Sequence, residues 1–189
     1  MLYYKKLNVP NFELIRNELE NATSNSVKEN LRFWDVPFSW FKDNAPLTYE
    51  FINTRKKVPV RLCRFYLTPK YKVLLPHVDG LTDKRAPMGL NIPIIGHENT
   101  SMDWYDCPND NLIDGEYGFN KIHASKVVDF TKLVKVDTTV IDCPTFVRTD
   151  IVHGITNYKP STRLVVSIRF PYTATFGQNF EDVMDLSGL

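Results

Sequence analysis

From residue 58 onward the sequence changes to short stretches rich in β-branched and aromatic residues, separated by Gly, Pro, Asn and Asp. These stretches predict strands over residues 58–67, 71–78, 88–95, 101–105, 134–140, 145–148, 151–153 and 163–170. About eight short strands with turn signals between them favour an antiparallel sandwich or barrel, and their number fits a jelly roll of the cupin type. No Gly-rich βαβ fingerprint, P-loop or GxSxG elbow occurs, which argues against nucleotide-binding and α/β-hydrolase folds.

The chain before these strands is helical in character, so the expected fold class is mainly β with flanking helices. The predicted elements there are a short strand at 2–7, a helix opening at Asn11, a polar loop at 21–26 and a helix over 46–55. We predict a single domain in which residues 1–57 pack on a strand core of residues 58–170, followed by a tail over 171–189. Residues 106–120 are rich in Asn, Asp and Gly, and are predicted to form a long surface loop that acts as a lid.

Composition restricts the compartment and the partners. Lys and Arg number 23 against 22 Asp and Glu, so the net charge of +1 does not favour a nucleic-acid partner. Three cysteines without a CxxC pair suggest neither a disulfide framework nor a structural zinc site. No apolar run has the roughly 20 residues of a membrane span. We therefore expect a cytoplasmic protein without a membrane partner, acting on a small-molecule or peptidyl substrate.

One histidine and one aspartate stand two residues apart at the end of a predicted strand. Side chains alternate between the faces of a strand, so His77 and Asp79 point the same way. Of the other histidines, His153 is the best third ligand because it also lies where an apolar strand opens into a turn, whereas His97 and His123 read as surface residues. Two imidazoles and one carboxylate form the facial triad typical of non-haem Fe(II) oxygenases, which leaves coordination positions open. The alternative is a hydrogen-bonded pair of His77 and Asp79 at a strand end.

The last predicted strand carries two arginines among apolar residues. Its apolar pattern indicates burial on both faces, and a buried arginine requires an anion. Arg163 is suited to bind a carboxylate in two hydrogen bonds, and Ser167 on the same face adds a donor. Two alternatives remain open: Arg163 pairs with Asp150, or Arg169 is the residue that binds the carboxylate. Two further residues are candidates for contact with a co-substrate: Asn91 and Tyr66.

Taken together, His77-Val78-Asp79, His153 and Arg163 resemble the HxD…H…R pattern of the Fe(II)/2-oxoglutarate-dependent dioxygenases. The distal His-Gly-Ile-Thr-Asn is similar to the prolyl-hydroxylase and aspartyl/asparaginyl-hydroxylase-like branches. In that family a serine usually follows the arginine by two residues, where this chain has Val165. The resemblance implies a double-stranded β-helix in which His77, Asp79 and His153 bind Fe(II). It also implies that Arg163 pairs with the far carboxylate of 2-oxoglutarate, with O₂ as oxidant.

This resemblance implies a hydroxylase that oxidises an unactivated C–H and releases succinate and CO₂. The prime substrate stays open between an amino acid, a peptidyl residue and another small molecule. Three alternatives are kept: a cupin-like binding or isomerase module, a non-catalytic jelly roll, and a nucleic-acid dealkylase of the same superfamily. The spacing of Arg163 and Arg169 resembles the paired arginines of those dealkylases.

Overall fold

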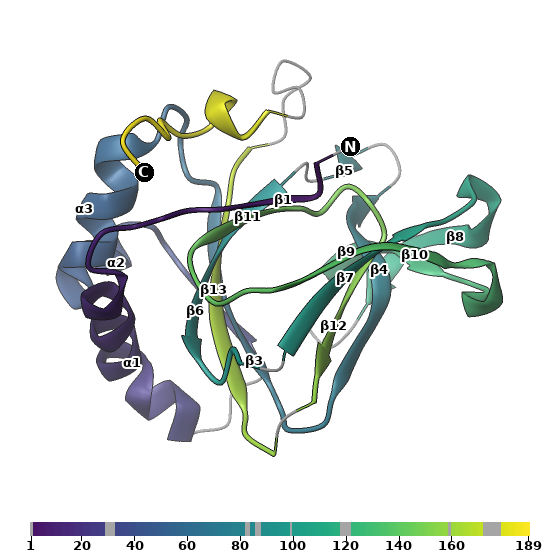
Figure 1. Cartoon of the computed structure of the whole chain (residues 1–189), viewed down its shortest axis with the longest axis horizontal. Coiled ribbons are helices and arrows are strands. Elements are labelled where there is room, and N and C mark those ends of the chain that lie inside the picture. Colours follow the sequence, from purple (N-terminus) through teal and green to yellow (C-terminus); the bar gives the residue numbers. More distant parts are fainter. Residues whose placement is uncertain are drawn as a thin grey trace.

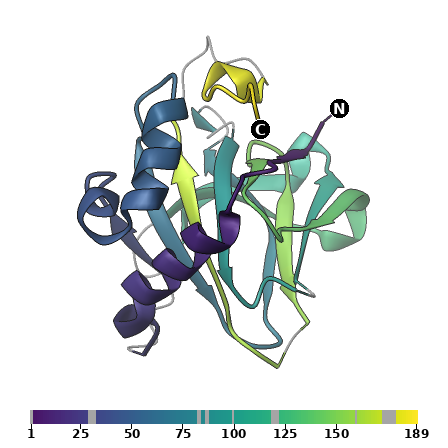
Figure 2. The same cartoon turned by 60° about the vertical axis from the view of Figure 1, so that its left-hand side comes forward.

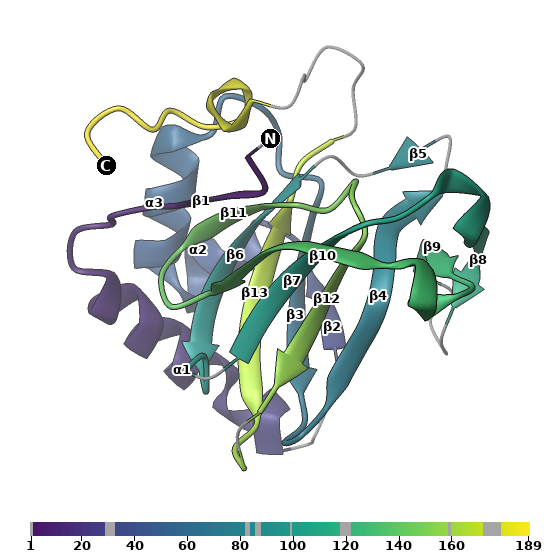
Figure 3. The same ribbon diagram turned by 45° about the vertical axis from the view of Figure 1, so that its right-hand side comes forward.

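Two antiparallel sheets face each other in the computed structural model of the chain (Figures 1 and 3). The structure describes residues 2–28, 33–81, 84–85, 88–98, 100–117, 122–158, 160–171 and 179–189, without the side chains of 81, 84, 85, 116, 117, 122 and 123. One sheet has the strand order β1-β11-β6-β13-β3-β2, and the other has the order β10-β7-β12-β4-β9-β8 with β5 paired to β4. This arrangement is a jelly roll, so the predicted double-stranded β-helix is confirmed.

The strands are short, as expected for this architecture. In the six-stranded sheet they are β1 (Tyr4–Lys6), β2 (Phe33–Val36), β3 (Leu62–Thr68), β6 (Met88–Ile95), β11 (Thr145–Arg148) and β13 (Arg163–Arg169). In the other sheet they are β4 (Val73–Leu81), β5 (Lys84–Arg85), β7 (Thr100–Asp106), β8 (Leu112–Tyr117), β9 (Ile122–Val127), β10 (Val134–Val140) and β12 (His153–Asn157). The predicted strand at 88–95 is confirmed at both ends by β6.

Three helices of the described chain cover the outer face of the six-stranded sheet (Figures 1 and 2). They are α1 (Phe12–Lys28), α2 (Trp40–Asn44) and α3 (Pro46–Arg55). The predicted helix over 46–55 is confirmed, with proline in its first turn. The Glu18 carboxylate of α1 accepts hydrogen bonds from the backbone N–H groups of Leu47 and Thr48, at 2.8 and 3.0 Å. These two donors have no partner inside the helix, so this contact both caps α3 and joins it to α1.

The polar loop predicted at 21–26 is wrong, because α1 continues to Lys28. Ile15, Leu19 and Thr23 recur at helical spacing and are buried, which places them on one face of the helix. The Thr23 hydroxyl donates to the carbonyl oxygen of Leu19 at 2.7 Å. Tertiary packing of this face therefore overrides the low helix propensity of the Asn- and Ser-rich segment.

The long loop predicted at 106–120 is also wrong. After a single 3₁₀ turn at Asn109–Asn111, β8 pairs with β9 at the edge of the seven-stranded sheet, while residues 118–121 lie outside the described chain. The Asn111 amide accepts from the backbone N–H of Asp129 and donates to its carbonyl oxygen, both at 2.8 Å. A polar residue that suggested a loop instead closes the base of a β-hairpin, and the described part of the segment is not a free lid.

The central strand β13 separates the helix-facing core from the space between the two sheets. Its even-numbered residues pack in the core beneath the helices: Leu164, Val166 and Ile168. Its odd-numbered residues point the other way, toward the opposite sheet. A proline within a strand normally marks an edge or a bulge. Pro93 lies in β6, which is an inner strand, and the register of β6 with β13 shifts beside this proline.

No helix in the described part of the chain is long and apolar enough to cross a membrane.

Candidate metal centre

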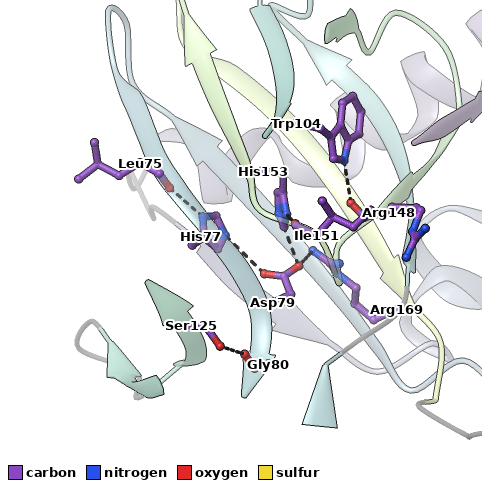
Figure 4. Close-up of polar contacts among 10 residues, drawn as sticks. All are labelled: Leu75, His77, Asp79, Gly80, Trp104, Ser125, Arg148, Ile151, His153 and Arg169. Atoms are coloured by element: carbon purple, nitrogen blue, oxygen red, sulfur yellow. Dashed lines mark hydrogen bonds and ion pairs between the residues drawn. The ribbon is translucent and has the colours of Figure 1, made fainter. Parts of the chain in front are cut away.

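His77 and Asp79 lie on β4, and His153 is the first residue of the neighbouring strand β12 (Figure 4). His153 pairs directly with His77 in the strand register, although a strand ending at residue 153 was predicted. One ligand atom from each of the three side chains lies within 4.8 Å of the others. Two segments more than seventy residues apart therefore bring together the three predicted metal ligands.

Both imidazoles are held by the backbone through the same ring nitrogen. Nδ1 of His77 contacts the Leu75 carbonyl oxygen and Nδ1 of His153 contacts that of Ile151, each at 2.8 Å. Because a carbonyl oxygen only accepts, each Nδ1 carries the proton and each neutral ring keeps its lone pair on Nε2. The Nε2 atoms lie near Asp79, at 3.5 Å from Oδ1 for His77 and 3.9 Å from Oδ2 for His153. Such backbone contacts orient histidines that bind metals.

The electrostatics of the group favour the metal-binding form of two of the three ligands, Asp79 and His153. Burial by itself raises the pKa of Asp79, but the Arg169 guanidinium and the histidines hold it far below its usual range. Burial, together with the neighbouring His77, lowers the pKa of His153 to about 4. Burial also lowers the pKa of His77, but the Asp79 carboxylate outweighs it and leaves that pKa raised. Asp79 is thus ionised and His153 neutral at pH 7, as metal coordination requires.

A cavity between the sheets adjoins these ligands. Its polar lining includes five of the predicted site residues: Tyr66, His77, Asp79, Asn91 and His153. Arg169 and Thr68 complete the polar lining, and the apolar wall consists of Leu74, Met102, Ile155 and Val165. The three described side chains that are able to bind a metal therefore lie at the wall of this cavity.

Arg163 is almost fully buried, with 1% of its surface exposed. Its Nε and both terminal nitrogens have no hydrogen-bond partner among the described residues. Burial lowers the pKa of Arg163 to about 10. Asp150, the alternative partner considered from the sequence, pairs with Arg148 instead. Arg163 is not among the described residues that line the cavity, but it shares a strand face with the cavity residue Val165, and its guanidinium is a buried cation without a described hydrogen-bond partner.

Asn91 and Ser167 lie opposite each other in the register of β6 and β13. Both are buried, and Oδ1 of Asn91 and Oγ of Ser167 have no hydrogen-bond partner among the described residues. Tyr66 lines the cavity together with Arg169. Ser167 lies beside Gly89, where a Cβ atom would come within 3.1 Å of its Oγ.

His97 lies in the turn after β6 and is not part of the group. The side chain of His123 is outside the described part of the chain. The sequence did not indicate the contact between Arg169 and Asp79, whose atoms NH2 and Oδ2 are 2.8 Å apart. Strand alternation assigns Arg169 to the inner face of β13, but not to a partner on another sheet.

Comparison with known proteins supports the architecture. No protein-family model matches the chain, and no curated protein sequence matches it. The structure of SnoK, a non-heme alpha ketoglutarate dependent carbocyclase from nogalamycin biosynthesis, is similar with a TM-score of 0.55 and 14% identity, covering 95% of this chain and 83% of SnoK. AviO1 from Streptomyces viridochromogenes Tue57 has a TM-score of 0.52 and 17% identity, with 91% of this chain and 90% of AviO1 covered. At these identities the likeness concerns the fold.

Proposed function

We propose that this protein, which shares its fold with a non-haem 2-oxoglutarate-dependent enzyme, is itself an Fe(II)- and 2-oxoglutarate-dependent oxygenase. The reaction proposed is hydroxylation of an unactivated C–H of an amino acid, a peptidyl residue or another small substrate, with release of succinate and CO₂. The observation that carries the proposal is the convergence of His77, Asp79 and His153 beside a cavity.

The donor set fits Fe(II). Two neutral imidazoles and one carboxylate are the ligands of the facial triad, whereas a closed zinc site normally has a fourth protein ligand. In the proposed enzyme His77, Asp79 and His153 hold Fe(II), which when bound with 2-oxoglutarate supplies the oxidising chemistry with O₂. The backbone carbonyls of Leu75 and Ile151 fix the two rings so that Nε2 of each faces the metal position.

Arg163 supports a dicarboxylate as the co-substrate. A buried guanidinium without an anion is unfavourable by several kcal/mol, and a carboxylate bound in two hydrogen bonds removes this penalty. In this proposal the 2-oxo acid end of 2-oxoglutarate lies at the metal position and its far carboxylate pairs with Arg163. Asn91 and Ser167 offer further hydrogen-bonding atoms on the same inner surface.

Two alternatives are weakened by specific observations. A purely structural jelly roll would not explain a buried arginine with no partner among the described residues. A cupin-like module that binds an anion without oxidation would explain it, and the Fe(II) titration described below separates that module from an oxygenase. A nucleic-acid dealkylase is disfavoured by the net charge of +1, because nucleic-acid binding is dominated by contacts with phosphates. Hydroxylation of a small or peptidyl substrate therefore remains the proposed reaction.

Anaerobic titration of the purified chain with Fe(II), with and without 2-oxoglutarate, tests the proposal. We expect a weak visible charge-transfer band that requires both additions and is lost in Asp79→Ala. Absence of both metal binding and 2-oxoglutarate binding would overturn the proposal. Succinate release in the presence of O₂, screened over free amino acids and short peptides, then identifies the substrate class.

A further inference from the structure

Arg169 contacts one oxygen of the proposed metal-binding carboxylate. Its NH2 atom lies 2.8 Å from Oδ2 of Asp79, which is also 3.9 Å from Nε2 of His153, while Oδ1 lies 3.5 Å from Nε2 of His77 (Figure 4). We infer that Arg169 is a positioning residue: it holds Oδ2 so that Asp79 presents Oδ1 alone to the metal. This inference rests on the proposed function and deepens its account of the metal centre.

The guanidinium is held in place from more than one side. Arg169 lies at the end of β13, opposite Gly89 of β6, where a Cβ atom would come within 3.0 Å of its NH1 and 3.2 Å of its Cδ. A larger residue than glycine at this position would therefore displace the arginine. The absence of a side chain at Gly89 makes room for Arg169 against the neighbouring strand.

Tyr66 on β3 lines the same cavity as Arg169. Burial lowers the pKa of the Arg169 guanidinium, but Asp79 and, after it, Tyr66 raise it. Arg64 lies two residues before Tyr66 on the same face of β3. Arg64 is in turn bound in two contacts by Asp35 on β2, with Nε–Oδ1 at 2.5 Å and NH2–Oδ2 at 2.7 Å. A row of charged and polar groups thus connects an edge strand of the sheet to Asp79. Second-layer contacts of this kind restrict the orientation of metal ligands.

Removing Arg169 changes the metal affinity in opposite directions depending on whether it positions Asp79 or only balances its charge. A cation beside a metal site repels the metal, so removing a residue that merely balances Asp79 would leave metal binding unchanged or tighter. If Arg169 holds the carboxylate in its binding orientation, removing it weakens metal binding despite the relief of repulsion. The two roles therefore predict opposite changes.

The experiment is a titration of the full-length chain with Co(II) alone, followed by visible absorption. We expect Arg169→Gln to weaken Co(II) binding about 10- to 100-fold and to change the shape of the Co(II) spectrum, because Oδ2 becomes free to bind. Arg169→Lys keeps the charge but loses the planar fork, and is expected to restore part of the affinity. Arg16→Gln, which removes an arginine from a pair on the surface of α1, is the matched control and should bind like the wild type.

Tyr66→Phe gives an independent measurement that leaves both arginines in place. We expect a smaller loss of Co(II) affinity with the same direction of spectral change, and circular dichroism verifies that each variant is folded. Unchanged or tighter Co(II) binding in Arg169→Gln would overturn the positioning role and leave the proposed function standing. If Arg169→Gln does not fold, the same result in Tyr66→Phe would overturn it. Failure of the wild type to bind Co(II) would remove the proposed function and this role with it.

Discussion

The Arg148 guanidinium binds the carboxylate of Asp150 through two nitrogens, with Nε 2.9 Å from Oδ1. Both residues lie between the end of β11 and His153. Because Asp150 binds Arg148, it is not the partner of Arg163 that the sequence suggested as an alternative. The two buried arginines are therefore unequal. Arg148 is part of a closed ion pair, whereas Arg163 has no hydrogen-bond partner among the described residues.

Replacing Arg163 is expected to stabilise the chain while removing its response to 2-oxoglutarate. Exchange of a buried charge for an apolar side chain of similar size is neutral or stabilising by about 1–4 kcal/mol. Arg163→Met should therefore raise the melting temperature of the ligand-free protein. In the metal-loaded protein, 2-oxoglutarate should raise the melting temperature of the wild type but not that of the variant, as measured by thermal denaturation.

Arg148→Met is the matched control. It leaves Asp150 without its partner, so we expect a loss of about 3–5 kcal/mol in the free energy of unfolding. If Arg163→Met kept the full thermal shift with 2-oxoglutarate, Arg163 would not be the residue that binds the far carboxylate.

Asp79→Ala is expected to abolish metal binding and to destabilise the metal-free chain. The substitution removes a ligand and also leaves the largely buried Arg169, whose side chain is 13% exposed, without its carboxylate, at a cost of about 3 kcal/mol. The double variant Asp79→Ala/Arg169→Met should recover much of this stability but no metal binding. Chemical denaturation and Co(II) titration of the same samples measure the two effects; an unchanged stability in Asp79→Ala would contradict the ion pair.

Cys63 is expected to resist alkylation in the folded protein. Burial, together with the nearby Asp35, raises the pKa of the Cys63 thiol to about 12, so at pH 8 almost none of it is the reactive thiolate. Cys107 and Cys143 are partly exposed. Iodoacetamide at pH 8, followed by mass spectrometry, should modify those two first and all three only in denaturant. Equal rates for the three thiols in the folded protein would refute the burial of Cys63.

Asn111 is expected to stabilise the hairpin of β8 and β9. Asn111→Ala removes both part-buried hydrogen bonds to the Asp129 backbone, at about 0.5–1.5 kcal/mol each. Hydrogen exchange should accelerate in β8 and β9 before the rest of the sheet. Asn109→Ala, at an exposed position in the same turn, serves as the control. Equal exchange in the two variants would show that the side chain of Asn111 does not hold the hairpin.

Strand alternation explains why much of the fold was predictable. The apolar runs at β6 and β13 are long enough to show which strands are buried on both faces, and the proline of α3 marks its first turn. The helix over 21–26 and the strand β8 within 106–120 were missed for a shared reason. Their polar residues have local preferences for loops, but Thr23 and Asn111 are satisfied by contacts with a carbonyl or with a distant segment.

The sequence by itself determined that His77 and Asp79 share a face, because their spacing matches the period of a strand. It also indicated that Arg163 is buried and needs an anion. Only the tertiary structure decided that His153 lies opposite His77, that Asp150 binds Arg148, and that Arg169 reaches Asp79. These contacts join strands that are distant along the chain, and their register depends on bulges and on packing between the two sheets, which local periodicity does not encode.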